Sequence, residues 1–157
     1  MKTIKSLYYH NPSPQGFEKM ITHYQKRGYR FINLQELYEF LAGNKTLSEK
    51  LAFVSFDDGW QGNLHLIPII EKYQVPICIF VATEPLESGN FWWEYVAKYM
   101  GVKKMFQFKN LPYGEFYKQL AEIKQQITLN RSAMTKEQMI DLAKHPLVTI
   151  QSHTVNH

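Results

Sequence analysis

Two short runs of almost uninterrupted apolar residues constrain the fold more than any other feature of this sequence. They are Leu51–Phe56 and Ile77–Val81. Runs of this length and composition are typical of strands buried on both faces, as happens in parallel sheets that helices cover. Segments with helical periodicity lie between these and other strand-like runs. The alternation predicts an α/β fold with a parallel sheet and right-handed crossovers.

The alternation of strand-like and helix-like segments continues along the rest of the chain. Capping boxes predict one helix that begins after Asn33 and another that begins after Thr135. Further strands are expected at 7–9, 29–32 and 147–150, and further helices at 17–26, 61–73, 91–100 and 115–129. The 157 residues are 45% hydrophobic, which suffices for one domain with a core. They are too few for a complete (β/α)₈ barrel, which needs about 200 residues or more.

Charge and hydropathy argue against several classes of function. The chain has 18 Lys and Arg against 14 Asp and Glu, but the basic residues are scattered along it. We therefore expect no nucleic-acid partner, since such sites gather basic residues into a patch. No run is apolar and long enough to predict a membrane span. The N-terminus lacks the apolar stretch of a signal peptide, which predicts a cytoplasmic location, or an extracytoplasmic one if a leader was removed.

An acidic pair directly follows the first apolar run. Asp57 and Asp58 are two of only three Asp in the chain, and Gly59 comes next. In parallel α/β folds, polar residues at the carboxyl ends of strands line the active site. Because successive side chains leave a strand in opposite directions, one carboxylate can hold a metal while its neighbour acts as a base. The alternative is structural, with Asp58 as the N-cap of a helix that begins near Trp60.

The sequence also carries two histidines four residues apart, His153 and His157, just after the predicted strand 147–150. Their imidazoles meet on one face if this segment turns helically. Neutral imidazoles suit Zn²⁺ and similar divalent ions. With one carboxylate they form a three-ligand site with open positions, which is typical of catalytic zinc rather than structural zinc. Such a site lowers the pKa of a bound water next to the spare carboxylate.

These two motifs resemble those of the polysaccharide deacetylases that share the NodB homology domain, carbohydrate esterase family 4. Ser55–Gly59 is similar to the first motif of the family, in which two Asp follow a Phe and precede a Gly. His153–His157 is similar to its second motif, in which two His flank three residues. The likeness extends over essentially the whole chain, with softer similarities at 8–10, 28–37, 91–93 and 145–148.

The resemblance implies a fold, a reaction and a set of site residues. The fold is an incomplete, distorted (β/α) barrel with parallel strands and outer helices, formed by residues 1–157 as a single truncated domain. The reaction is metal-dependent removal of N-acetyl groups from an amino-sugar polysaccharide or oligosaccharide. Asp57 is implied to be the general base, and Asp58, His153 and His157 to hold Zn²⁺ or another divalent metal. The later motifs of the family lie downstream of the second, so we expect this stretch alone to be weakly active or inactive.

Other interpretations stay open at this point. A non-catalytic module that binds glycans or other partners is the main alternative, and His10 is the further histidine best placed to join the site. Trp92 and Trp93 point about 100° apart on a helix, so at most one is expected to face a cleft, and core packing is expected for both. A barrel opened after five or so strands also leaves parallel strand edges exposed, which predicts self-association.

Overall fold

A computed structural model describes residues 4–46 and 48–156, which form a five-stranded sheet whose pairings are all parallel. The strands are β1 (Ile4–Tyr9), β2 (Tyr29–Ile32), β3 (Lys50–Asp58), β4 (Ile77–Val81) and β5 (Val148–Ser152). Strand β1 pairs with one edge of β3. Strands β2 and β4 share the other edge, β2 beside 50–53 and β4 beside 55–58. Strand β5 pairs with β4, and in the described residues the sheet stays open, which confirms the expected incomplete barrel.

The five predicted strands are all present, but β3 extends further than its apolar run. It continues through Asp57 and Asp58, which pair with Phe80 and Val81 of β4. The acidic pair therefore lies on the end of the strand itself rather than in the loop after it. Because both residues pair with β4, the sheet fixes the backbone of both.

Eight α-helices and a 3₁₀ helix connect the strands in the described part of the chain. They are α1 (Pro14–Gln25), α2 (Leu34–Leu41), the 3₁₀ helix η1 (Gln61–Leu66), α3 (Ile67–Tyr73), α4 (Thr83–Ser88), α5 (Trp92–Met100), α6 (Val102–Phe108), α7 (Tyr113–Gln126) and α8 (Lys136–Leu142). The capping boxes predicted at Asn33 and Thr135 are both formed. The middle of the chain is helical as expected, although α4 and α6 are additional helices.

The expectation of one continuous helix at 61–73 is wrong. Residues 61–66 form η1, and α3 begins at Ile67 with Pro68 in its first turn. Proline has no backbone N–H to donate and clashes with the preceding turn, so it favours the first turn of a new helix over the interior of a longer one. The chain therefore restarts its helix at Ile67.

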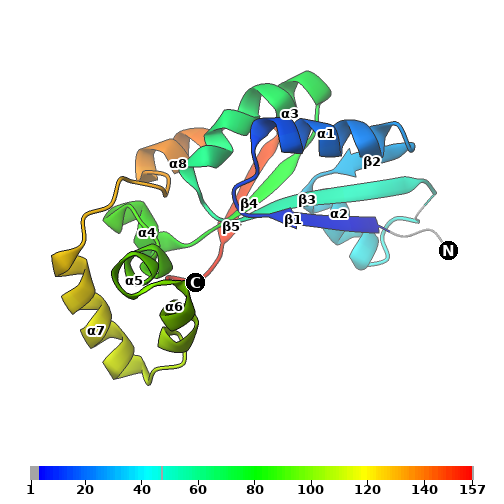
Figure 1. Cartoon of the computed structure of the whole chain (residues 1–157). Helices are drawn as coiled ribbons and strands as arrows, with labels where there is room; N and C mark the ends of the chain where they lie inside the picture. Colours follow the sequence, from blue (N-terminus) through cyan, green and yellow to red (C-terminus); the bar gives the residue numbers. More distant parts are fainter. Residues whose placement is uncertain (1–3, 47, 157) are drawn as a thin grey trace.

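The sheet is covered on both faces, as the apolar runs predicted. Figure 1 shows α1, α3 and α8 along one side of the sheet and α2 on the other. Alternate residues of β3 enter two separate cores. Val54 and Phe56 pack in the cluster that includes α1 and α3, whereas Leu51 and Phe53 pack with Cys78 in the cluster that includes α2. Burial, and secondarily the charge of Asp57, raises the pKa of the Cys78 thiol to about 12.

Helices α5, α6 and α7 have a small core of their own. It contains Tyr95, Val96, Phe108, Leu120 and Ile123. Figure 1 shows these helices beyond the carboxyl ends of the strands, where the chain leaves β4 before it returns to β5. They add a wall to the end of the sheet at which the candidate site lies. None of the described helices is both apolar enough and long enough to cross a membrane.

Candidate active site

The carboxyl end of β4 brings the two sequence motifs together. Asp58 pairs with Val81 in the sheet, and its carbonyl accepts a 3.1 Å hydrogen bond from the N–H of Ala82. On the other side of β4, the N–H of His153 donates to the carbonyl of Val81 at 2.9 Å. The side chains then approach each other, with Asp58 Oδ1 3.8 Å from His153 Nε2. Residues 95 positions apart in sequence thus share one strand end.

The turn at Asp58 and Gly59 fixes the direction of the buried carboxylate. Asp58 has φ +76° and Gly59 has φ +87°, both in the left-handed region. A Cβ on Gly59 would lie 3.0 Å from Val81 Cγ1, so the close approach to β4 also favours glycine. Asp58 is 1% exposed and accepts a 3.0 Å hydrogen bond from the indole N–H of Trp60 through Oδ2. The structural alternative for Asp58 is not observed, because the N-cap of η1 is Trp60 and no side chain caps that helix.

The loop before α8 supports the turn that follows Asp58. The N–H of Met134 donates to the carbonyl of Gly59 at 3.0 Å, and the N–H of Gln61 donates to the carbonyl of Ser132 at 2.8 Å. Trp60 forms an antiparallel bridge with Ala133. The turn is therefore held from two sides, by β4 and by this loop.

The donor atoms at the strand ends suit a divalent metal ion. The 3.8 Å between Asp58 Oδ1 and His153 Nε2 is longer than a hydrogen bond. It fits two ligands of one ion, because metal–ligand bonds of about 2.0–2.2 Å allow donor atoms to lie up to roughly 4 Å apart. A carboxylate and an imidazole are also the ligand types that zinc accepts.

The third predicted ligand cannot be placed, since His157 lies outside the described residues. Within 4–46 and 48–156, no group of three or more His, Cys, Asp or Glu forms a metal cluster. The predicted helical turn is not formed at 153–156, where the backbone is irregular and Thr154 has φ +65°. The described residues of this segment therefore do not form the helix on which the prediction of a shared face depended.

A cavity of about 280 Å³ opens over the buried carboxylate. Its lining combines Asp58 with a histidine, a lysine and several apolar side chains: His10, Trp60, Trp92, Trp93, Met105, Phe106 and Lys109. All three tryptophans of the sequence are among them. Asp57 is half-buried next to Asp58 and is not one of these lining residues.

Trp92 and Trp93 both line the cavity, so the expectation that at most one would do so is wrong. Each also packs against neighbours. Trp93 stacks on Phe91 at 4.7 Å between ring centroids, and Trp92 lies 5.2 Å from Phe116. An indole is large enough to pack with one edge while another edge borders a cavity, which a helix-angle argument overlooks.

The structure adds residues to the site that sequence reasoning did not select. His10 was considered and does line the cavity, with its carbonyl held by a 2.9 Å hydrogen bond from the buried Asn63. Met105, Phe106 and Lys109 come from α6 and the residue after it, and they were missed. An apolar residue, an aromatic and a lysine on a short helix carry no signal that separates them from ordinary surface or core.

Comparison with known proteins gives a family and a fold. A family model described as polysaccharide deacetylase matches residues 44–157. Among curated proteins, none matches the chain. The solved structure of IcaB from Ammonifex degensii is 26% identical, covers 62% of this chain and 48% of its own, and has a TM-score of 0.52.

Two further solved structures have the same fold over nearly all of this chain. A de-N-acetylase from Aggregatibacter actinomycetemcomitans is 20% identical with a TM-score of 0.60, over 96% of this chain and 54% of its own. The Streptococcus pyogenes deacetylase PplD, in complex with acetate, is 22% identical with a TM-score of 0.52, over 99% of this chain and 57% of its own. This chain therefore spans about half the length of these relatives. Since the family model covers well over half of the chain and includes both the acidic pair and the segment 153–157, the chain belongs to the polysaccharide deacetylase family.

Proposed function

We propose that this chain carries the centre of a metal-dependent deacetylase that hydrolyses N-acetyl groups of amino-sugar polysaccharides or oligosaccharides. The observation that supports this most is the 3.8 Å approach of Asp58 and His153 beside a cavity that three tryptophans line. Indole rings offer flat apolar surfaces with a polar N–H, which suit the faces of sugar rings. The family to which the chain belongs supports an acetylated glycan as the substrate class.

The proposed metal ligands are Asp58, His153 and His157, with Zn²⁺ or another divalent ion. When bound, such an ion supplies Lewis-acid chemistry, polarising an amide carbonyl and raising the acidity of water. The indole N–H of Trp60 orients the carboxylate of Asp58 through its 3.0 Å hydrogen bond. Outer partners of this kind fix a ligand in place and tune its affinity for metal.

Asp57 is the proposed general base. Its carboxylate accepts a proton from the water that adds to the acetamide carbonyl, after which the C–N bond breaks. The nitrogen takes up a proton, so that acetate and a free amine leave. Asp57 sits at the end of β3 and is half-buried, which leaves it accessible to water. The aromatic walls hold the sugar and limit bulk water around it.

Metal binding tests the ligand set directly. Zinc titrated calorimetrically into the 157-residue chain is expected to bind stoichiometrically. Asp58→Asn and His153→Gln should each lose this binding. Asp141→Asn is the matched control, because Asp141 is an exposed aspartate on α8. If Asp58→Asn binds zinc as tightly as the wild type, the proposed site is wrong.

Acetate release tests the reaction. We expect slow release from N-acetylglucosamine oligomers that a chelator stops and that Asp57→Asn abolishes. The cavity that the three tryptophans line also favours a second candidate, a non-catalytic glycan-binding module. Sugar binding that survives both the chelator and Asp57→Asn, without any acetate release, would establish that candidate instead.

A further inference from the structure

Helix α6 and the residue after it form one wall of the cavity. Met105, Phe106 and Lys109 all line it, and Met105 and Lys109 are one helical turn apart. Phe106 is 56% exposed, whereas Phe108 on the same helix is 3% exposed and packs in the core of α5–α7. The ring of Phe106 is therefore part of the cavity surface and is not buried in the core.

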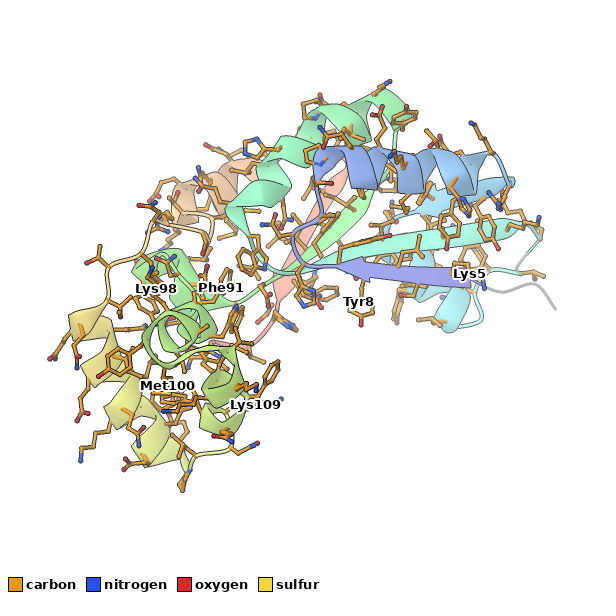
Figure 2. All side chains as sticks on the ribbon, in the orientation of Figure 1. Lys5, Tyr8, Phe91, Lys98, Met100 and Lys109 are labelled. Carbon is orange, nitrogen blue, oxygen red and sulfur yellow. The ribbon has the colours of Figure 1, made fainter. Side chains whose placement is uncertain are left out.

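Lys109 gives this wall a positive charge. Its Nζ lies 5.8 Å from the centroid of the Phe106 ring, a cation–π contact that favours a position of the ammonium group beside the ring. Four other lysines form ion pairs with carboxylates in the described part of the chain, and Lys109 forms none there. Figure 2 shows Lys109 on the side of α6 nearer to the strands. Its charge is thus available to a ligand in the cavity.

The cavity has opposite charges at two of its walls. The buried carboxylate of Asp58 lies at the strand end, and the ammonium group of Lys109 lies at the C-terminal end of α6, with indole rings also lining the space. A neutral glycan would occupy the cavity without using the charge of Lys109. A glycan with an anionic group would gain a charge-assisted contact with it.

Resting on the proposed function, we propose that Lys109, together with Phe106, selects glycans that carry an anionic group close to the acetylated sugar. The group is a carboxylate, as on a uronic acid, or a phosphate, as on a sugar phosphate. Phe106 offers its exposed ring to the sugar, and Lys109 pairs with the anion. Lys109 is then a specificity-determining residue, and the acetyl group is directed to the strand ends.

Intrinsic tryptophan fluorescence of the full chain reports binding in this cavity, because every tryptophan of the sequence lines it. The carboxylate arm compares an oligomer of alternating glucuronate and N-acetylglucosamine with a neutral N-acetylglucosamine oligomer of equal length. The phosphate arm compares N-acetylglucosamine 1-phosphate with N-acetylglucosamine. In at least one arm we expect about three- to tenfold tighter binding of the acidic probe. Added salt should reduce this preference.

Substitutions at Lys109 and at a lysine of α6 test whether the preference for acidic glycans depends on Lys109 itself. Lys109→Met should bring the affinity for the acidic probe down to that for the neutral one, and Lys109→Arg should keep the preference. Lys103→Met is the matched control, because Lys103 is an exposed lysine of α6 that does not line the cavity. Equal binding of acidic and neutral probes in both arms, or an unchanged preference in Lys109→Met, would refute the subsite and leave the proposed function standing. If no probe, neutral or acidic, binds, both proposals fail.

Discussion

The turn Asp58-Gly59-Trp60 combines a buried carboxylate, a left-handed backbone and an indole hydrogen bond in three consecutive residues. Asp58 presents a carboxylate that is 1% exposed, in a left-handed backbone conformation that few residues with a side chain adopt. Gly59 permits the close contact with Val81, and Trp60 donates the hydrogen bond that orients the carboxylate. Unusual backbone angles of this kind gather at functional sites, where the surrounding structure holds them in place.

Gly59→Ala tests the contact with β4. The new Cβ would lie 3.0 Å from Val81 Cγ1, and the alanine would have to adopt a φ of +87°. We therefore expect the free energy of unfolding to fall by about 3 kcal/mol. Gly43→Ala is the matched control, since Gly43 has φ +77° but a Cβ at that position would meet no atom within 4 Å. Gly43→Ala should lower the free energy of unfolding, measured by urea denaturation, by about 1 kcal/mol. Equal costs for the two variants would show that the approach to Val81 contributes nothing.

Trp60→Phe tests the orientation of the proposed metal ligand. The substitution keeps an aromatic ring and removes the indole N–H that donates to Asp58 Oδ2. We expect the dissociation constant for zinc to rise about tenfold or more in a calorimetric titration. Trp93→Phe changes another indole of the cavity without removing that hydrogen bond and should have a smaller effect. The prediction fails if both variants bind zinc like the wild type.

At the scale of elements, β4 organises the site although it contributes no predicted ligand. It lies between β3 and β5, so the residues at its end, Val81 and Ala82, hold the backbones of Asp58 and His153. The helices between β4 and β5 then add the aromatic wall. Helices α1 and α3, which cover one face of the sheet, are also joined by polar contacts, and we expect the contribution of these contacts to stability to depend on pH.

Glu18 of α1 links the two helices by accepting hydrogen bonds from Lys72 at 2.8 Å and Tyr73 at 2.9 Å. The bond from Lys72, and then that from Tyr73, lowers the pKa of Glu18 below its ordinary value of 4.5. Because the pKa is lower in the folded chain, the contribution to stability is full above about pH 4.5 and is lost as the pH falls through the folded-state pKa. Glu18→Gln should therefore lower the Tm slightly at neutral pH and match the wild type in acid.

Thermal unfolding followed by circular dichroism across this pH range measures the difference. Glu122→Gln, at an exposed position of α7, is the control and should show no such pH-dependent difference. A Tm difference for Glu18→Gln that stays constant into acid would contradict the link between α1 and α3.

At the scale of the whole molecule, three strands of the described sheet have an open side. Strands β1 and β2 pair only with β3, and β5 pairs only with β4, within residues 4–46 and 48–156. A groove of about 300 Å³ runs beside β5, lined in part by Ile150, Gln151 and Ser152. Open strand edges present unpaired N–H and C=O groups to other chains. Self-association of this chain therefore remains our prediction.

Sedimentation velocity over a range of concentrations checks this prediction. We expect the sedimentation coefficient of the chain to rise with concentration, and Gln151→Lys to reduce the rise, because a charge on an edge strand opposes pairing. Gln119→Lys places the same charge on α7, away from the strand edges, and should leave the rise unchanged. A wild-type chain that sediments as a monomer at high concentration would rule out association through these edges.

Local sequence patterns were enough to predict the strands, the two capping boxes and the nature of the core. The residues of β3 enter both cores because an apolar run with no polar alternation has two faces to bury. The break at Ile67 was missed although Pro68 is visible in the sequence, because η1 and α3 share one periodic pattern across that residue. The separate helix α6 was missed because its pattern is short.

The sequence by itself determined which residues are the candidates for chemistry, since Asp57, Asp58, His153 and His157 stand out by type, spacing and place after strands. Only the tertiary structure decided that Asp58 and His153 approach within 3.8 Å, because that distance depends on β4 lying between their two strands. It also decided that Phe106 of α6 and Lys109, the residue after that helix, line the cavity. Periodicity and capping report interactions between residues a few positions apart, whereas a site is made by packing between segments that the sequence keeps far from each other.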